Sequence, residues 1–176
     1  AYCKGQVYSA HGNRFVALTR PDVYERQCFP AAMPTERTPR QKILFENEGL
    51  QLWTTGDNIG IISFKTKMCT ISTAVLEGLT AALEYAESNT LTGLIIWQKD
   101  QPHFSAGADL MEFAEQFLLE GAASLAPNLE TFQQTLLSLR YANRPIVAAT
   151  RGYVLGGGCE LMMHCDKTVA ALESYI

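Results

Sequence analysis

The sequence predicts an α/β domain, because strands and helices alternate along most of the chain. From Lys42 onward, short runs of β-type residues give way to segments with apolar residues at helical spacing, and this alternation continues to the last strand. Such an order favours helices packed in layers on a sheet. A length of 176 residues with 47% hydrophobic and 18% charged residues fits one globular domain.

Three β-type runs open the domain, and a helix follows them. Glu-Gly and Gly-Asp-Asn turn signals separate the runs, which cover 42–46, 50–55 and 59–65. Residues 72–88 then predict an amphipathic helix. Its apolar face consists of Val75, Leu76, Leu79, Ala82, Leu83 and Ala86.

The next elements are a buried-type strand, "LTGLIIWQK", a polar loop, "DQPHFSAGADL", and two helices. The first helix, "LMEFAEQFLLEG", is predicted to end at Gly121. The second is predicted from Asn128 through Ala142, with Asn128 as its N-cap. Its apolar side chains at helical spacing are Leu129, Phe132, Leu136 and Leu139.

The last part repeats the pattern of strand, loop and helix. Pro145 closes the preceding helix, and "PIVAATRGY" predicts a second buried strand. After the run Gly156–Gly158, residues 159–164 predict a short helix and "KTVAAL" a final strand.

The first 40 residues differ in composition from the rest. They hold six Lys and Arg against three Asp and Glu, a net charge of +3, while the whole chain has −4. Four of the seven prolines also lie there, and no helix or strand period runs through the stretch. We expect residues 1–41 to form an N-terminal arm or linker. A contact with a polyanion is the alternative interpretation of its basic residues.

Composition also limits the expected partners. A net charge of −4 argues against a nucleic-acid partner and an anionic membrane surface. No run reaches the ~18 apolar residues of a membrane span. The five cysteines are odd in number and lack CxxC spacing, which favours reduced thiols and a cytoplasmic location over disulfides or zinc.

Two loops stand in equivalent places, each after a buried strand and before a helix: "HFSAGADL" and "GYVLGGGCE". Ligands of α/β proteins bind where strands end and helices begin. Two backbone N–H groups converging there would make an oxyanion hole, each donor worth on the order of 10²–10³ in rate. Glu160 lies one helical turn past the glycines, in reach of such a point as an acid or base.

The segments "FSAGADLMEF" and "RPIVAATRGYVLGGGCELMMHCD" resemble the two signature segments of the crotonase superfamily, the enoyl-CoA hydratases and isomerases. The likeness covers about 42–176, and its style is nearest the hydratase modules joined to 3-hydroxyacyl-CoA dehydrogenases. It implies a crotonase-like spiral of ββα units, incomplete at the C-terminus. It also implies an acyl-CoA thioester substrate of fatty-acid β-oxidation, with coenzyme A as part of the substrate and no separate cofactor.

The resemblance implies roles for particular residues. The backbone N–H groups of Ala106 and Gly157 match the oxyanion hole of the family, and Glu160 matches its first catalytic glutamate. Residues expected to bind the substrate are Gly107, Ala108, Asp109, Gly156 and Lys67, the last as a basic residue for the nucleotide phosphates.

One expected residue is missing from the sequence. Hydratases of the family use a second glutamate about twenty residues after the first, which falls near position 180. Glu173 is seven residues too early for this role. The chain starts with Ala and stops inside an apparent strand, so we expect a truncated piece that is inactive alone. The resemblance also implies a homo-oligomer in the full-length form. A fused dehydrogenase domain is suggested only by the likeness to hydratase modules of that kind, since no GxGxxG nucleotide-binding motif occurs here.

Simpler interpretations stay open for several of these residues. The three glycines fit a tight turn, and Glu160 fits an exposed helix position. His164, Cys165 and Asp166 are consecutive and cannot all face one metal ion from a helix. Cys159 is expected to be a small packed residue rather than a reactive thiol.

Three functions of different kinds therefore remain. They are hydration of trans-2-enoyl-CoA, another crotonase chemistry such as double-bond isomerisation or thioester hydrolysis, and a non-catalytic unit for CoA binding or docking. A Glu near position 180 favours hydration over the other two chemistries. Affinity for acyl-CoA without turnover would single out the third.

Overall fold

The structure is a computed structural model that describes residues 2–3, 6–9, 12–17 and 41–176. The chain divides into two compact units, Ala1–Pro39 and Arg40–Ile176. Each unit is described by itself.

The described part of the first unit is a three-stranded antiparallel meander. Its strands, in the order β1-β2-β3, are β1 (Tyr2–Cys3), β2 (Gln6–Ser9) and β3 (Arg14–Ala17). The sequence predicts no strand here, because runs of two to four residues are too short to show a period. The part of the expected linker that covers 18–40 lies outside the described residues.

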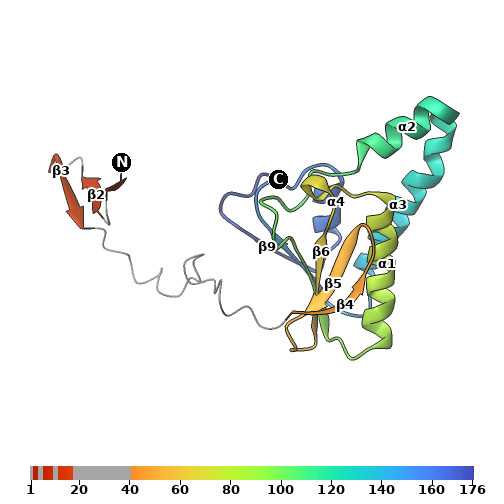
Figure 1. Ribbon diagram of the computed structural model, residues 1–176, viewed down its shortest axis with the longest axis horizontal. Helices are drawn as coiled ribbons and strands as arrows, with labels where there is room; N and C mark the ends of the chain where they lie inside the picture. Colours follow the sequence, from red (N-terminus) through yellow and green to blue (C-terminus); the bar gives the residue numbers. More distant parts are fainter. Residues whose placement is uncertain (1, 4–5, 10–11, 18–40) are drawn as a thin grey trace. The chain divides into compact units, whose positions relative to one another are not determined.

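The second unit is built on a six-stranded mixed sheet in the order β4-β5-β6-β7-β8-β9 (Figure 1). Strands β4 to β6 pair antiparallel, and β6 to β9 pair parallel. The bounds are β4 (Lys42–Glu46), β5 (Leu50–Thr54), β6 (Ile59–Phe64), β7 (Gly93–Trp97), β8 (Ile146–Thr150) and β9 (Lys167–Ala170). Because β7 and β8 are parallel neighbours, the loops that follow them leave the same edge of the sheet.

Helices are inserted between the strands, as the sequence predicts. They are α1 (Thr73–Ser88), α2 (Leu110–Glu120), α3 (Leu125–Arg140) and α4 (Gly157–Met163), with the 3₁₀ turns η2 (Lys67–Cys69) and η3 (Ala122–Ser124). Helix α1 packs on β5 and against α3. Figure 1 shows α1 and α3 together on one side of the sheet. The predicted α/β layers are confirmed.

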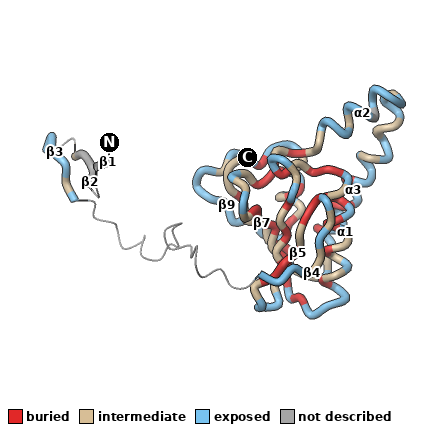
Figure 2. The backbone as a smooth tube through the Cα atoms, in the orientation of Figure 1, coloured by how far each residue is buried: buried red, intermediate tan, exposed pale blue. Residues whose placement is uncertain are grey.

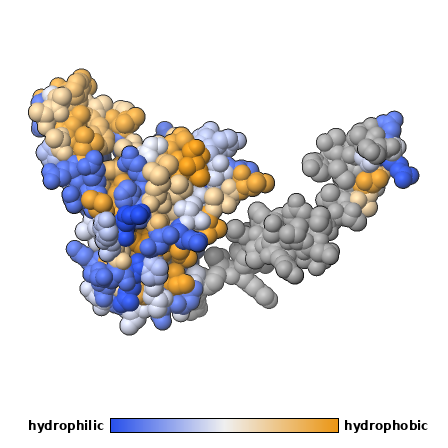
Figure 3. All heavy atoms as spheres, turned by 180° about the vertical axis from the view of Figure 1, so that it is seen from behind, coloured by the Kyte–Doolittle hydropathy of each residue, from blue (hydrophilic) through white to orange (hydrophobic). Residues whose placement is uncertain are grey.

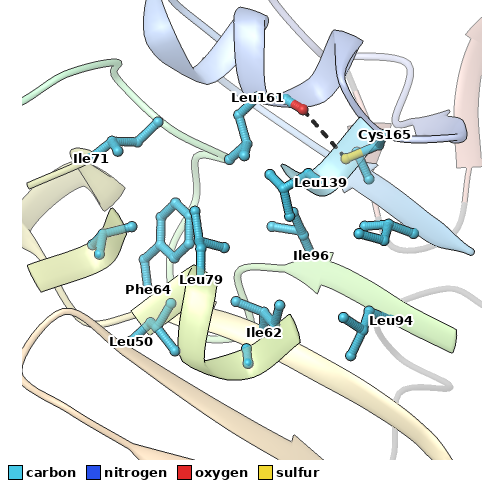
Figure 4. Packing of buried hydrophobic residues seen from close by; sticks show 14 of the residues in the cluster. Leu50, Ile62, Phe64, Ile71, Leu79, Leu94, Ile96, Leu139, Leu161 and Cys165 are labelled. Carbon is cyan, nitrogen blue, oxygen red and sulfur yellow. Dashed lines mark hydrogen bonds between the residues drawn. The ribbon is translucent and has the colours of Figure 1, made fainter. Parts of the chain in front are cut away.

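The core lies between the sheet and these two helices (Figure 2). Helix α1 buries Val75, Leu79 and Ala82 of its predicted face, and Leu83 is half-buried. Figure 4 shows Leu79 beside Leu50 and Ile62 of the sheet, and Leu139 of α3 beside Ile96 of β7. The largest side chains that are fully buried in this core are Phe104, Leu50, Leu52, Ile62, Ile71, Leu79, Leu94, Ile96, Leu136, Leu139, Ile146 and Leu161.

The start of α3 differs from the prediction. The helix begins at Leu125, after the 3₁₀ turn η3, so Asn128 lies inside it and is not its N-cap. Pro127 fits in the first turn, because the N–H that proline lacks has no partner there in any helix. Of the apolar residues at helical spacing, Leu129 is 51% exposed, while Phe132, Leu136 and Leu139 are buried.

Helix α2 exposes much of its apolar surface. Its exposed apolar side chains are Leu110, Met111, Phe117, Leu118 and Leu119. Figure 3 shows apolar residues gathered at the upper end of the molecule, where α2 and the start of α3 lie in Figure 1. Among the described residues, no helix combines the length and the hydropathy that crossing a membrane requires.

Candidate active site

The two loops singled out in the sequence lie against each other. The loop after β7 and the loop after β8 form a parallel bridge between Ser105 and Val154. The Ser105 N–H donates to the carbonyl of Tyr153 at 3.0 Å, and the Leu155 N–H donates to the carbonyl of Ser105 at 3.0 Å. These bonds bring "FSAGAD" beside the glycine run at the edge of the sheet.

The two loops also approach each other closely where Gly107 and Ala108 meet Gly157. A Cβ atom on Gly157 would lie 3.3 Å from the backbone nitrogen of Ala108 and 2.6 Å from Cζ of Phe132. A Cβ atom on Gly107 would lie 2.9 Å from the carbonyl oxygen of Leu155, and Gly107 has a φ of +102°. Glycine is therefore required at both positions, once by close packing and once also by its left-handed backbone.

Two backbone N–H groups at this junction have no acceptor among the described residues. They belong to Ala108 and to Gly157, the first residue of α4. The first N–H groups of a helix have no partner within the helix and are available to a ligand. Small residues around them leave the backbone accessible. The junction therefore offers two unbonded N–H donors to a ligand.

The N–H of Ala106, which the sequence assigned to the oxyanion hole, is already engaged. It donates to the carbonyl of Met68 at 3.1 Å. A bonded N–H is not available to a ligand unless this contact breaks. The structure thus places Ala106 beside the junction, where the unbonded N–H belongs to Ala108, two residues further on. The accepting carbonyl belongs to η2, where Met68 and Cys69 both have a φ of 54°.

Glu160 lies in the first turn of α4, three residues after Gly157. Its side chain is exposed and makes no hydrogen bond or ion pair with any described residue. Its backbone is held at both ends, because its N–H donates to the carbonyl of Gly156 and its carbonyl accepts from the N–H of His164. Glu160 therefore lies on a fixed helical turn that begins at Gly157, the residue of one free N–H group.

The other predicted residues for substrate binding divide into two groups. Asp109 has a structural role, because its carboxylate caps α2 by accepting from the Met111 N–H at 3.0 Å and also accepts from the Thr70 hydroxyl at 3.2 Å. Gly156 has a φ of 48° and forms the turn that starts α4. Lys67 is exposed in η2, and its ammonium has no partner among the described residues, so it can bind an anion.

A cavity of about 70 Å³ lies behind the junction. Its lining residues are Ile71, Ser72, Thr73, Leu76, Glu112, Phe113, Asn128, Thr131 and Phe132. Phe132 belongs both to this lining and to the packing on Gly157. Glu112 closes one side, because its carboxylate accepts from the N–H and the hydroxyl of Thr73 at 2.9 and 3.0 Å.

Two further kinds of chemistry can be examined in the described part of the chain, at metal ligands and at the buried thiols. No three His, Cys, Asp or Glu side chains gather there in a group that could hold a metal ion. The Asp166 carboxylate accepts from the Ile146 N–H at 2.7 Å. Burial raises the pKa of the Cys69 thiol to about 11 and, together with the charge of Asp166, that of the Cys165 thiol to about 12. Both thiols are therefore protonated at neutral pH and are poor nucleophiles.

Two residues that support the loops were not predicted. Arg151 holds the loop after β7, because its guanidinium donates to the carbonyls of Gln98, Lys99 and Gln101 at 2.6 to 3.1 Å. Ser105 is fully buried under Gly158 and donates its hydroxyl proton to the carbonyl of Cys69. Neither contact has a signal in the sequence, since both depend on how distant loops meet.

Comparison with known proteins identifies the fold and its family. The model of the family described as enoyl-CoA hydratase/isomerase matches residues 54–176. A 2,3-dehydroadipyl-CoA hydratase of Escherichia coli is 39% identical over 100 residues, covering 57% of this chain and 37% of that protein. A probable 3-hydroxyacyl-CoA dehydrogenase of Bacillus subtilis is 28% identical over 134 residues, covering 76% of this chain and 17% of that protein.

Solved structures give the same result for the fold. An enoyl-CoA hydratase/carnithine racemase from Magnetospirillum magneticum aligns with a TM-score of 0.66 and 23% identity, covering 73% of this chain and 48% of that one. An enoyl-CoA hydratase/isomerase from Xanthobacter autotrophicus aligns equally well, at 24% identity and 48% of its length. The crotonase-like fold is confirmed, and the chain spans half or less of the relatives named here.

Proposed function

The chain belongs to the enoyl-CoA hydratase/isomerase family, and on this premise we propose that it is the thioester-binding part of an enzyme that hydrates trans-2-enoyl-CoA to 3-hydroxyacyl-CoA. The observation that supports the proposal most is the pair of unbonded N–H groups of Ala108 and Gly157. In this assignment they form the oxyanion hole, with Ala108 in place of Ala106.

The chemistry explains why two N–H donors are useful. When a nucleophile adds to the β-carbon of an enoyl thioester, negative charge moves onto the carbonyl oxygen, which takes on enolate character. Donors that already point at that oxygen stabilise the charge without reorganising, and each is worth on the order of 10²–10³ in rate. The tight packing of Gly107 and Gly157 holds the two donors in one place.

Glu160 is proposed as the acid or base of the reaction. In hydration, the oxygen of water bonds to the β-carbon, one proton of the water goes to a base, and a proton is delivered to the α-carbon. A positioned carboxylate contributes about 10²–10⁴ to such a step. A second carboxylate, expected near position 180, is the proposed partner that shares these proton transfers with Glu160.

The remaining residues fit a CoA thioester as the substrate, with no further cofactor. Lys67 is exposed and without a partner among the described residues, so it is proposed to bind a phosphate of the nucleotide. The segment Gly107–Asp109 is proposed to lie along the pantetheine. The cavity behind Phe132 adjoins the thioester position and is proposed to take part of the acyl group.

Isomerisation or thioester hydrolysis in the same oxyanion hole is the alternative chemistry, and a CoA-binding or docking unit without turnover is the non-enzymatic one. Both alternatives stay open because the Glu160 side chain is exposed, and no described residue covers it. We also propose a fused dehydrogenase domain in the whole protein. Its support is the likeness to a probable 3-hydroxyacyl-CoA dehydrogenase and to a putative fatty acid oxidation complex trifunctional enzyme of Rickettsia felis, 33% identical over 132 residues.

The test is hydration of crotonyl-CoA, which is measured as the loss of absorbance of its enoyl group. The 176-residue chain, a longer protein extended past Ile176, and the longer protein with Glu160→Gln are compared. We expect turnover in the longer protein and its loss by about 10²–10⁴ in the variant. Binding of crotonyl-CoA without turnover in either protein would favour the non-catalytic alternative, and a shifted double bond without hydration would favour isomerisation.

A further inference from the structure

The hydroxyl of Ser105 connects the two segments that surround the proposed thioester site. Ser105 is fully buried, and its hydroxyl donates to the carbonyl of Cys69 at 2.7 Å. The same hydroxyl accepts from the N–H of Gly107 at 3.1 Å. One oxygen thus ties η2 to the loop that carries Ala108.

The first segment that Ser105 contacts, η2, has a backbone conformation that residues other than glycine rarely adopt. Met68 and Cys69 both lie in the left-handed region, with a φ of 54° each. Such residues persist only where surrounding contacts hold them. Here the Ala106 N–H binds the carbonyl of Met68 and the Ser105 hydroxyl binds that of Cys69. The exposed Lys67 directly precedes this turn, so its position depends on these contacts.

The second segment that Ser105 contacts is the loop after β7, and its backbone at Gly107 determines where the Ala108 N–H points. The Gly107 N–H is bound by Ser105, and the Gly107 carbonyl accepts from the Ile71 N–H at 2.8 Å. With bonds on both sides of Gly107, the peptide plane that joins it to Ala108 cannot rotate freely. The N–H of Ala108 lies in that plane.

Ser105 itself has no room to move. A Cβ atom on Gly158 would lie 2.6 Å from Cβ of Ser105 and 2.9 Å from its hydroxyl oxygen. Helix α4 therefore packs directly on Ser105. The residue that carries the second donor, Gly157, begins the same helix.

We propose that Ser105 is a positioning residue, whose hydroxyl sets the orientation of the Ala108 N–H and the placement of Lys67 at the same time. The segment that binds the thioester carbonyl and the segment that binds the nucleotide phosphates would then both be held by the buried hydroxyl of Ser105. This inference rests on the proposed function, since it concerns how that thioester is held.

The test uses 2,4-hexadienoyl-CoA, whose absorption moves to longer wavelength when donors polarise its thioester carbonyl. The full chain is titrated as wild type, as Ser105→Ala and as Ser63→Ala. Ser63 is a matched control, because its hydroxyl also donates to a carbonyl, that of Trp97 at 2.6 Å, and accepts one N–H, that of Trp53 at 3.1 Å.

We expect Ser105→Ala to lose most of the wavelength shift and about 10-fold in affinity, the order expected when a buried hydrogen bond is removed. Ser63→Ala should keep the wild-type shift and stay within about 2-fold in affinity. An unchanged shift and affinity in Ser105→Ala would overturn the inference alone. No binding and no shift in the wild type would instead refute the proposed function.

Two further measurements cover the case in which Ser105→Ala does not fold. The thiol of Ser105→Cys is a weaker donor of similar size, so this variant should show a smaller shift than the wild type. In the unsubstituted chain, the Gly107 amide should exchange its hydrogen slowly because Ser105 binds it. A full wavelength shift in Ser105→Cys, or exchange of the Gly107 amide at the rate of an unstructured peptide, would contradict the inference.

Discussion

Replacing Gly157 by alanine tests the junction of the two loops most sharply. The added Cβ atom would lie 2.6 Å from Cζ of Phe132, about 1 Å inside the usual carbon–carbon contact distance of about 3.5–4.0 Å. It would also lie 3.3 Å from the nitrogen of Ala108, so we expect it to hinder the approach of a carbonyl oxygen to that N–H. One substitution thus overpacks the core and covers a donor.

Two magnitudes follow from this geometry. Overpacking of this kind costs about 1–3 kcal/mol in the free energy of unfolding. Loss of an oxyanion donor costs about 10²–10³ in rate in the longer protein. Urea unfolding followed by tryptophan fluorescence measures the first, and the absorption shift of bound 2,4-hexadienoyl-CoA together with turnover measures the second.

The control and the second variant separate packing from donor access. Gly93→Ala places a Cβ atom 3.1 Å from the carbonyl oxygen of Pro145, away from the junction, so it should lower stability without changing the absorption shift. Adding Phe132→Leu to Gly157→Ala should show a coupling of about 0.5–3 kcal/mol in stability. The shift should stay lost, because the Cβ atom still covers Ala108. Wild-type stability and a wild-type shift in Gly157→Ala would refute the geometry.

Three other predictions concern charge and protonation. Glu160→Gln should change the free energy of unfolding by less than about 0.5 kcal/mol, because the side chain is exposed. It should lower turnover in the longer protein by about 10²–10⁴; urea unfolding and the hydration assay check the two parts. Lys67→Ala should weaken binding of butyryl-CoA about 2- to 5-fold at low salt, less at high salt, and leave binding of the pantetheine thioester unchanged, as measured by calorimetry. The raised pKa values of Cys69 and Cys165, about 11 and about 12, mean that the unfolded chain ionises these thiols first as pH rises above their ordinary 9.0. The contribution of these thiols to stability should therefore be full below pH 9 and be lost between pH 9 and about 12. In a variant with both Cys69→Ala and Cys165→Ala, the urea midpoint should change less with pH over that range.

The sequence predicts the strands and helices of the second unit well, because each has a clear period or a clear stop. The apolar face of α1 and the end of α2 at Gly121 are examples. The start of α3 was not predictable in the same way. A 3₁₀ turn without a capping side chain leads into it, and Pro127 resembles a break although it lies in the first turn.

The meeting of the two loops at the candidate site was predictable, while the roles of the residues there stay predictions. The order of strand, loop and helix, together with the glycine run, placed Gly157 and Glu160 correctly beside the loop that contains Ala106 and Ala108. Whether Ala106 or Ala108 keeps a free N–H depends on a contact with Met68, which lies far away in the sequence. The left-handed turn at Met68 contains no glycine, so the sequence gives no sign of it.

The most direct test of the account is an amide NMR titration of the chain with butyryl-CoA, a saturated thioester that cannot be hydrated. We predict that the amide protons of Ala108 and Gly157 move downfield on binding, because both donate to the thioester oxygen, while that of Ala106 stays where its bond to Met68 holds it. A downfield shift of Ala106 in place of Ala108, or no response at Gly157, would contradict the oxyanion assignment.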